Sequence, residues 1–236
     1  MNSTHEPINC RSHQPQPAGA FFSKLSPAAI EDLESIESPS DYAANQILFS
    51  EREPARGVLV VLSGEVKLSI NSSDGRRLSL RIAKKGDVLG LASALSGSPY
   101  ELTAETLYPA RLAHISRPAF LSFLARHPEV YQAATEELSR HVSMACAQLR
   151  TVGLSTSAPE KLARLLLDWS EGGQTTELGT RFRFCLTHEQ IGEFIGTSRE
   201  TVTRTMGAFK HRRLLSFQGS MLTISNRSAL ANYARG

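Results

Sequence analysis

The chain has 236 residues, a length that suits two domains of ordinary size better than one simple core. Apolar residues make up 41% of it and charged residues 21%, as in soluble globular chains, and no run approaches the ~20 apolar residues of a membrane span, which excludes a membrane protein. The net charge of +3 is unevenly spread, since residues 197–236 alone carry +6 and the remainder −3. Such a basic region suits phosphate binding, although it can equally serve solubility alone.

Residues 1–20 are polar and proline-rich, unlike a secretory signal, so we expect a disordered or loosely held tail on a cytoplasmic protein. Cys10, Cys146 and Cys185 are too few and too scattered for a disulfide framework, a zinc site or an iron–sulfur cluster. The seven histidines show no HxxxH or HxH spacing. We therefore expect neither a metal site nor an iron–sulfur cluster.

Residues 21–127 are expected to form a short helix and then a small antiparallel β-roll. Ser26 followed by Pro27 is a typical helix start. Apolar and polar residues then alternate at 65–70 and 77–82, which predicts two strands with one buried face each, joined by a turn at Asp74. Further short apolar runs, separated by Gly or Pro, lie at 47–49, 58–62, 88–91 and 112–115.

A long helix is predicted over residues 128–152, because Pro128 suits a helix start. Its apolar residues recur at alternating spacings of four and three, the a/d pattern of a two-stranded coiled coil. The same stripe would also serve a helix packed on its own domain, but three heptads between two domains favour a two-fold homodimer. The residues of this dimer seam are Tyr131, Thr135, Leu138, Val142, Ala145, Leu149 and Val152.

Residues 153–157 are rich in glycine and hydroxyl side chains and predict a hinge before the C-terminal domain, residues 158–236. A capping box of Ser157 with Glu160 predicts a helix directly after the hinge. Two more capping boxes, Thr187 with Gln190 and Thr197 with Glu200, predict two short helices joined by a turn at Gly196. Two apolar runs, 214–217 and 221–224, then flank a Gln-Gly-Ser turn and predict a hairpin.

The second of the two short helices points Val202, Met206 and Phe209 inward and leaves the opposite face free. That face carries residue types that hydrogen-bond to base edges in the DNA major groove, close to the helix end that a helix-turn-helix presents to bases. A helical hairpin with a solvated charged face is the alternative. The glycine turn, the double capping and the charged face together favour DNA reading by Arg199, Glu200, Thr203 and Arg204.

The second helix resembles the recognition helix of the Crp/Fnr superfamily of bacterial transcription regulators, and the matching residues are GTSRETVTR at 196–204. The resemblance covers roughly residues 21–224, because a β-rich domain, a long helix and a winged helix-turn-helix follow each other in that family. It implies an α+β fold with a sensory antiparallel β-roll, the double-stranded β-helix of cyclic-nucleotide-binding domains. A long dimerisation helix and a C-terminal winged helix-turn-helix domain complete this fold.

Arg199, Glu200 and Arg204 match the family's cyclic-AMP-receptor type, so the resemblance implies a palindromic operator with TGTGA-like half-sites in double-stranded DNA. Thr203 stands where glycine is usual, which leaves the middle position open, and its methyl group would suit a thymine. If the protein is an activator, the resemblance implies contact with RNA polymerase through a surface loop at about residues 172–183. Phosphate contacts are assigned to Thr187, His188, Ser198, Thr201 and Lys210.

Relatives that bind cyclic AMP hold its phosphate with an Arg-Ser pair and its ribose with the Glu of a Gly-Glu-Leu turn. In ungapped register these positions hold residues 101–102, Glu-Leu, and 90–92, Gly-Leu-Ala. A shifted register would not supply the cation, since no arginine lies between Arg81 and Arg111. A buried phosphate needs a cationic partner, so we expect no switching by cyclic AMP. Either the roll binds a more apolar effector or it is a structural platform; the candidate effector pocket is Leu91, Ala92, Glu101, Leu102 and Cys146.

An enzyme is not expected, because no nucleophile and base stand at motif spacing and no Walker lysine pattern occurs. A cupin-like ligand-binding enzyme with an accessory helical domain is the rival reading. It would need a cluster of metal-binding histidines on the strands, but His114 is the only histidine between residues 21 and 118. A third reading, a pure interaction module, does not explain the base-reading face.

Overall fold

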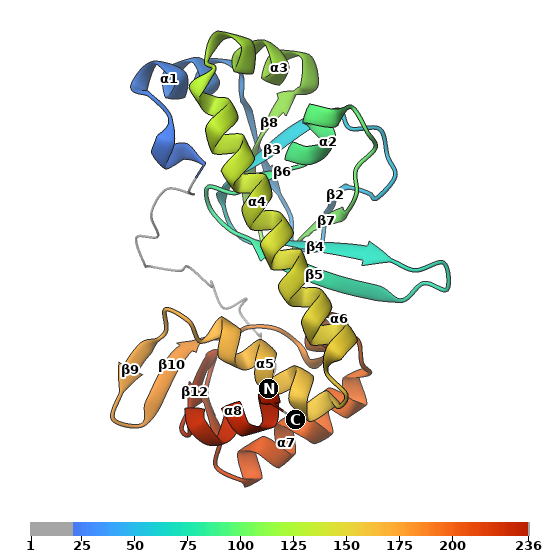
Figure 1. Ribbon diagram of the computed structural model, residues 1–236, viewed down its shortest axis with the longest axis vertical. Helices are drawn as coiled ribbons and strands as arrows, with labels where there is room; N and C mark the ends of the chain where they lie inside the picture. The colour runs from blue at the N-terminus through green and yellow to red at the C-terminus, as the bar shows by residue number, and fades with distance from the viewer. Residues whose placement is uncertain (1–20, 236) are drawn as a thin grey trace, which may run out of the picture.

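A computed structural model describes residues 21–235, and the tail expected at residues 1–20 lies outside them. The described chain forms a β-rich unit, a long helix α4 (Glu129–Leu149) and a helical C-terminal unit, arranged along the longest axis of the molecule (Figure 1). The α+β fold class and the predicted order of its parts are confirmed. Within residues 21–235, no helix is both long and apolar enough to cross a membrane.

The N-terminal unit is built on two four-stranded antiparallel sheets, ordered β1-β8-β3-β6 and β2-β7-β4-β5. Apolar side chains of both sheets meet between them, among them Phe49, Leu59, Leu68 and Leu112. The predicted roll is therefore confirmed. Its strands are β1 (Ser38–Tyr42), β2 (Ile47–Phe49), β3 (Gly57–Ser63), β4 (Val66–Asn71), β5 (Arg77–Ala83), β6 (Val88–Leu89), β7 (Thr103–Thr106) and β8 (Ala110–Ser116).

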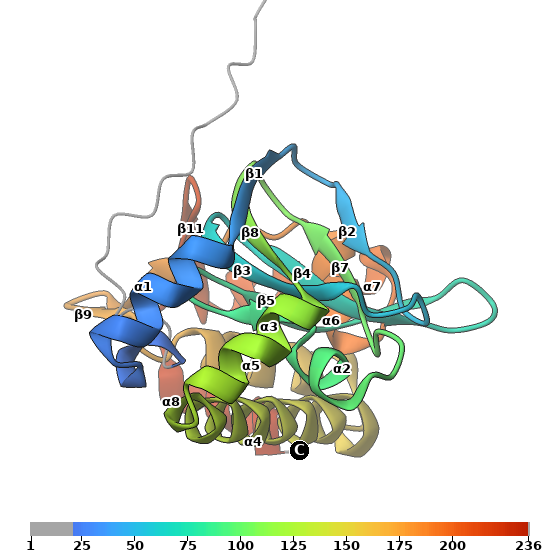
Figure 2. The ribbon, with the colours of Figure 1, turned by 90° about the horizontal axis from the view of Figure 1, so that it is seen from above.

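Short helices complete the roll. The helix α1 (Pro27–Ile36) begins at the predicted Ser-Pro pair, because the Ser26 hydroxyl accepts a hydrogen bond from the Ala29 N–H. Seen from above, α1, α3 and α4 lie on one side of the strands (Figure 2), where Phe120, Phe123 and Val130 pack into a second apolar cluster. These helices are η1 (Phe22–Lys24), α1 (Pro27–Ile36), α2 (Leu91–Ser96) and α3 (Arg117–Arg126).

The β4–β5 hairpin departs from the predicted pattern of one buried face. Lys67 and Ser69, expected to face solvent, are buried. In β5 the pairing register shifts opposite Leu68, so that Ser79 is buried and Leu80 only half-buried. The prediction of a solvated outer face was wrong because the C-terminal unit covers it.

The long helix does not stop at the predicted position. It continues as a five-residue π-helical turn, η2 (Arg150–Leu154), so the hinge expected at residues 153–157 begins inside helical backbone. The next helix is capped by Ser157, which accepts from the Glu160 N–H as predicted. The reciprocal half of that capping box is wrong, because the Glu160 carboxylate accepts from the Thr156 N–H, one residue earlier.

The C-terminal unit surrounds one apolar core with four helices and a four-stranded sheet, ordered β11-β12-β10-β9. The hairpin β11–β12 is the predicted wing. The segment expected to be a surface loop at 172–183 contains a second hairpin, β9–β10. The elements are α5 (Ala158–Trp169), β9 (Gln174–Thr176), β10 (Gly179–Arg183), α6 (His188–Ile195), α7 (Arg199–His211), β11 (Leu215–Gln218), β12 (Met221–Ile224) and α8 (Arg227–Arg235).

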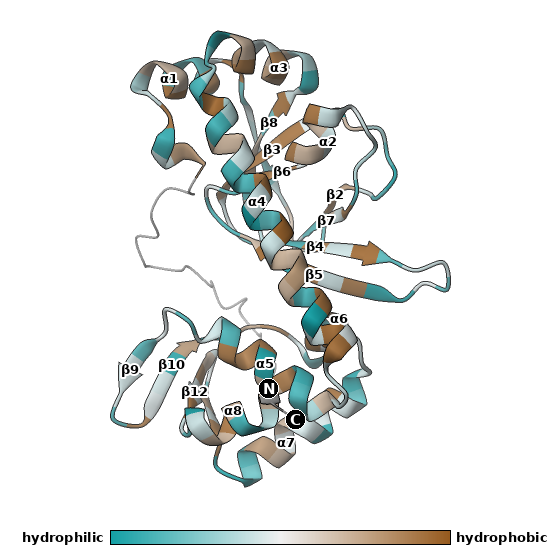
Figure 3. Ribbon diagram, in the orientation of Figure 1, coloured by the Kyte–Doolittle hydropathy of each residue, from teal (hydrophilic) through white to brown (hydrophobic). Residues whose placement is uncertain are grey.

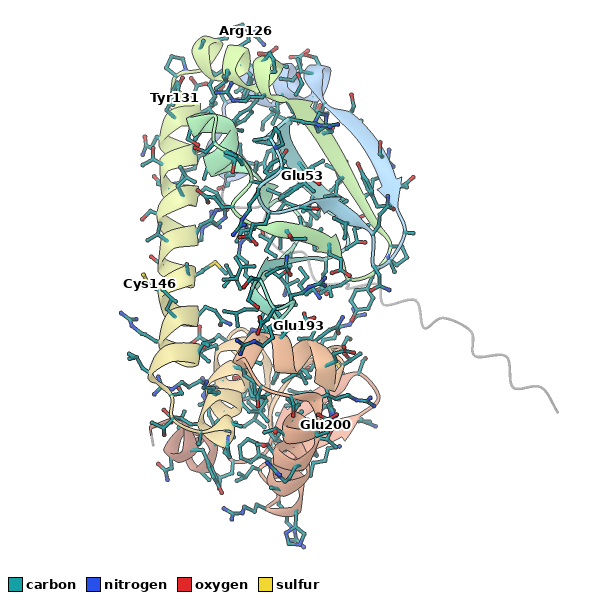
Figure 4. The ribbon with its side chains drawn as sticks, turned by 90° about the vertical axis from the view of Figure 1, so that its right-hand side faces the viewer. Glu53, Arg126, Tyr131, Cys146, Glu193 and Glu200 are labelled. Carbon is teal, nitrogen blue, oxygen red and sulfur yellow. The ribbon has the colours of Figure 1, made fainter. Side chains whose placement is uncertain are left out.

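The two units are joined by a polar contact between α6 and the β4–β5 hairpin, which we call the docking contact. Lys67 Nζ lies 2.8 Å from the Glu193 carboxylate, which also accepts from the Ser79 hydroxyl at 3.0 Å. The Gln148 amide of α4 donates to the carbonyls of Ser79 and Phe194 at 2.9 and 2.6 Å. Figure 4 shows Glu193 at this boundary. The first helix of the helix-turn-helix is thus held by both the roll and the long helix.

Candidate nucleic-acid interface

The helix-turn-helix begins with the predicted capping box. The Thr187 hydroxyl accepts from the Gln190 N–H, and the Gln190 side chain accepts from the Thr187 N–H at 2.9 Å. α6 then ends at Gly196, whose φ of +62° lies in the left-handed region that glycine adopts at little cost. The prediction of a helix, a glycine turn and a second helix is confirmed.

The start of the second helix differs by one residue from the prediction. Ser198, not Thr197, is the N-cap of α7, and its hydroxyl accepts from the Thr201 N–H. Thr197 is part of the turn, because its N–H is bonded to the Gly192 carbonyl at the end of α6. The capping box of Thr197 with Glu200 was therefore wrong, and Glu200 lies in the first turn of α7.

α7 separates a buried face from an exposed face, as predicted. The three residues expected to point inward are buried in the core of the C-terminal unit: Val202, Met206 and Phe209. The four candidate base-reading residues are all exposed and come from the first two turns of the helix: Arg199, Glu200, Thr203 and Arg204. This part of a recognition helix is the part that contacts base edges in the major groove.

Glu200 is held as a carboxylate. A hydrogen bond from its own backbone N–H, another from the Ser198 hydroxyl and the charge of Arg199 lower the pKa of Glu200 below its usual value. A carboxylate only accepts hydrogen bonds, and in the major groove the cytosine amino group is a matching donor. Figure 4 shows Glu200 within the C-terminal unit, on the side of Glu193 that faces away from the roll.

A contact that the sequence did not predict joins the two helices. His188, the first residue of α6, lies with Nδ1 2.8 Å from the Thr203 Oγ1 of α7. The same hydroxyl lies 2.9 Å from the carbonyl oxygen of Arg199, one turn earlier. The sequence separates His188 from Thr203 by 15 positions, and only the turn at Gly196 brings them together.

The candidate phosphate-binding residues lie around this face. The hydroxyls of Thr187 and Ser198 cap the two helices, so both stand at positive helix ends. Thr201 bonds Ser198 and is half-buried. Lys210 is exposed, with Nζ 4.5 Å above the ring of Phe217 in β11. This cation–π contact ties α7 to the wing and was not visible in the sequence.

Four of the seven residues of the predicted dimer seam are exposed on α4, whereas Val152 lies beyond α4 in η2 and is half-buried. Tyr131, Val142 and Leu149 are 49, 63 and 66% exposed. Leu138, in contrast, is half-buried against the core of the roll. Figure 3 shows hydrophobic and hydrophilic stretches alternating along α4. In Figure 4, Tyr131 lies on the side of α4 that faces away from the roll. A helix face that stays in solvent is mostly polar, so three large exposed apolar side chains on one face are typical of an interaction surface.

The five residues of the candidate effector pocket do not gather around one cavity. Leu91 is fully buried in the cluster that packs under α1 and α3, whereas Leu102 packs against the cluster between the sheets. Glu101 and Cys146 are exposed to solvent. A shallow cleft of about 270 Å³ lies elsewhere; it is lined by Ser50 to Arg52 after β2, by Asn71 to Ser73 at the tip of the β4–β5 hairpin and by Thr103 of β7.

Tyr100 fills space beside the turn at residues 90–92, to which the resemblance assigns the ribose position. Its ring stacks on Phe49 with 3.9 Å between centroids, and its hydroxyl donates to the buried Gly57 carbonyl at 3.0 Å. The ring also lies on Gly90, since a Cβ there would be 2.7 Å from Tyr100 Cε1. The aromatic residue directly before Glu101 was the sequence signal for this filling, and it was not among the predicted pocket residues.

Arg81, the last arginine before the position to which the resemblance assigns the phosphate, is paired elsewhere. Arg81 lies 2.9 Å from the Asp87 carboxylate and 2.9 Å from Nε2 of His141 on α4. Its side chain is 10% exposed, so it is packed between β5 and the long helix. Arg81 therefore does not replace the phosphate-binding arginine of relatives that bind cyclic AMP.

Comparisons with known proteins match both units. Residues 39–127 match the cyclic nucleotide-binding domain, and residues 160–233 match the Crp-like helix-turn-helix domain. The chain is 30% identical over 216 residues to the CRP-like cAMP-activated global transcriptional regulator of Mycobacterium tuberculosis, covering 91% of this chain and 96% of that protein. It is 28% identical over 214 residues to the transcriptional activatory protein AadR of Rhodopseudomonas palustris, covering 90 and 88%.

Solved structures share the fold. FixK2 from Bradyrhizobium japonicum superposes with a TM-score of 0.72 at 24% identity, covering 84% of this chain and 97% of that one. The c-di-GMP responsive global regulator CLP of Xanthomonas campestris gives 0.73 at 21% identity, covering 85 and 100%. With two domain matches in the right order and a relative at 30% identity over nearly its whole length, the chain belongs to the Crp/Fnr superfamily of bacterial transcription regulators.

Proposed function

We propose that this Crp/Fnr regulator acts as a homodimer that reads a palindromic, TGTGA-like operator and is not switched by cyclic AMP. The observation that carries the proposal is the exposed face of α7, with Arg199, Glu200, Thr203 and Arg204 in its first two turns. Its family consists of transcription regulators, and no enzymatic role is proposed.

Each charged residue of this face has a base that it suits. An arginine grips guanine O6 and N7 with two hydrogen bonds, and a carboxylate accepts from the cytosine amino group. Arg199, Glu200 and Arg204 can therefore read two guanines and one cytosine, which fits a TGTGA half-site and its complementary strand. Thr187, His188, Ser198, Thr201 and Lys210 would contact phosphates around them.

Dimerisation supplies the second recognition helix, which reads the second half-site. The exposed apolar residues of the dimer seam support a parallel pairing of two copies of α4. The two-fold axis then places two recognition helices about one DNA turn, ~10 bp, apart. If the protein is an activator, we propose that the β9–β10 hairpin contacts RNA polymerase; its Leu178 is highly exposed.

The roll is proposed to be a platform or the site of an effector other than cyclic AMP. Although the mycobacterial relative is described as cAMP-activated, this chain lacks an arginine at the phosphate position, and Tyr100 packs on Gly90. A cyclic nucleotide there would bury its phosphate without a cation. The filled interior favours the platform, with activity set by the abundance of the protein.

The test is selection of bound duplexes from random DNA by the full chain, followed by band-shift titration and sedimentation. A two-fold palindrome with half-site centres about 10 bp apart, bound by a dimer, is the expected result. Recovery of no palindrome would reject the proposed function. A band-shift against pooled random DNA separates this function from a pure interaction module, which would bind none.

A further inference from the structure

The His188–Thr203 contact sets what the Thr203 side chain can offer to a base. The hydroxyl has one hydrogen and lies within hydrogen-bonding distance of two groups: the Arg199 carbonyl at 2.9 Å and His188 Nδ1 at 2.8 Å. For both contacts to be hydrogen bonds, the hydroxyl has to donate its hydrogen to Arg199, because a carbonyl oxygen only accepts. His188 must then donate through Nδ1–H.

This assignment does not depend on the charge of the imidazole. Nδ1 carries a hydrogen in the imidazolium and in one of the two neutral tautomers, and the contact selects that tautomer. Thr203 Oγ1 is thereby held by two partners, one on its own helix and one on α6. With its hydrogen already used, the hydroxyl cannot donate to a guanine or a thymine oxygen.

We propose that His188 is a positioning residue for base recognition: it fixes the Thr203 side chain so that its methyl group, rather than its hydroxyl, reads the DNA. The proposal rests on the proposed function, because Thr203 must face a base. An unrestrained threonine bonds to any of several bases, whereas a fixed methyl favours the C5-methyl of thymine. His188 thus narrows the preference at the middle position of the half-site.

The test uses operator duplexes in which thymine is replaced by deoxyuridine, which lacks only the C5-methyl. At the position facing Thr203, one replacement in one half-site should lower the affinity of the unchanged protein about fourfold, the value of one buried methyl group. Replacement at the other thymines serves as the internal control and should change the affinity less.

Four variants assign the effect. Thr203→Ser keeps the hydroxyl but has no methyl. The ratio of its affinity for the thymine duplex to its affinity for the deoxyuridine duplex should therefore fall to about one. Thr203→Val keeps a methyl and should keep the ratio. His188→Ala removes one of the two partners of the hydroxyl and leaves only the Arg199 carbonyl, so the ratio should fall and the base preference should broaden. His188→Asn returns an N–H donor at a similar distance and should restore both.

A double variant separates positioning from other roles. In the Thr203→Val background there is no hydroxyl to hold, so His188→Ala should leave the ratio unchanged. If His188→Ala instead weakens all sequences equally and keeps the ratio, His188 is only a phosphate contact and the proposal is overturned. The proposal is also overturned if replacing any thymine by deoxyuridine leaves the affinity of the unchanged protein the same. In both cases a recovered palindrome leaves the proposed function standing, and circular dichroism checks that each variant is folded.

Discussion

At the scale of single residues, the most informative side chain of the roll is Tyr100. Its hydroxyl is the donor for the Gly57 carbonyl, and both lie in the interior. We predict that Tyr100→Phe lowers the free energy of unfolding by about 1–2 kcal/mol, because a buried acceptor loses its donor. Urea denaturation measures this change. Tyr42→Phe is the control, since the structure gives the hydroxyl of this half-buried tyrosine no partner within residues 21–235, and it should change stability little.

The same packing bears on ligand binding. Tyr100 lies on Gly90, and Glu101 occupies the position to which the ungapped resemblance assigns the phosphate-binding arginine. We predict that calorimetry with cyclic AMP and with cyclic GMP shows no saturable heat, because a buried phosphate without a cationic partner is strongly disfavoured. A micromolar affinity for either nucleotide would contradict this prediction.

Two cations of α7 should act differently on DNA. Arg204 is exposed on the base-reading face, whereas Lys210 lies two turns later beside the wing. Arg204→Ala is expected to cost about 1–3 kcal/mol on the cognate operator and to relax the preference at one guanine. Lys210→Ala should weaken binding to all sequences alike and flatten the salt dependence. Equal relaxation of sequence preference by both variants would argue against these roles.

At the scale of elements, the dimer seam of α4 is the part to test. Leu149 is 66% exposed in the chain and would be buried between two copies of the helix. We predict that Leu149→Glu gives monomers that have largely lost operator binding, because a buried charge opposes pairing and the two half-sites must be held together. Sedimentation measures the mass.

The matched control is Ser143→Glu, which introduces the same carboxylate at an exposed position of α4 outside the seam. It should leave the dimer intact. Leu138→Glu is a poorer test, because Leu138 also packs on the core of the roll and the substitution would destabilise the domain itself. An intact Leu149→Glu dimer would reject the seam.

Local signals in the sequence were sufficient for most elements. The caps at Ser26, Ser157 and Thr187 were predicted because a hydroxyl side chain bonds a backbone N–H three residues later, which is a local event. The choice between Thr197 and Ser198 could not be predicted from side-chain type, because both carry hydroxyls. The backbone of the turn decided it, by bonding the Thr197 N–H to α6.

At the scale of the whole molecule, the docking contact could not be predicted, because it joins residues far apart in sequence. Lys67 and Glu193 are separated by 126 positions. Alternation of apolar and polar residues placed Lys67 in solvent, and it is 3% exposed. The exposed face with Thr203 was predicted from helical spacing, residue types and the glycine turn, whereas the contact of Thr203 with His188 and the filling of the roll by Tyr100 depend on tertiary contacts.

Loss of one partner of the docking contact should lower the free energy of unfolding of the whole chain. In Glu193→Gln the amide oxygen can still accept from the buried Lys67, but Glu105, 3.5 Å away, is then its one carboxylate partner among residues 21–235. We predict a loss of up to about 3 kcal/mol, below that of a fully buried pair because Glu105 remains and Glu193 is partly exposed. Thermal unfolding and limited proteolysis between residues 153 and 157 measure it. Glu189→Gln, an exposed change on the same helix, is the control, and equal behaviour of the two variants would refute the prediction.

The docking contact also limits how freely the domains of this protein can be exchanged. Ile82 of the roll packs against the core of the C-terminal unit, and Lys67 is covered by α6. A DNA-binding domain transplanted onto the roll of another regulator would therefore arrive with an exposed apolar patch and an unpaired Glu193. Chimaeras cut between residues 153 and 157 should need Lys67, Ser79 and Ile82 carried into the new roll to remain soluble and to be held at the same angle.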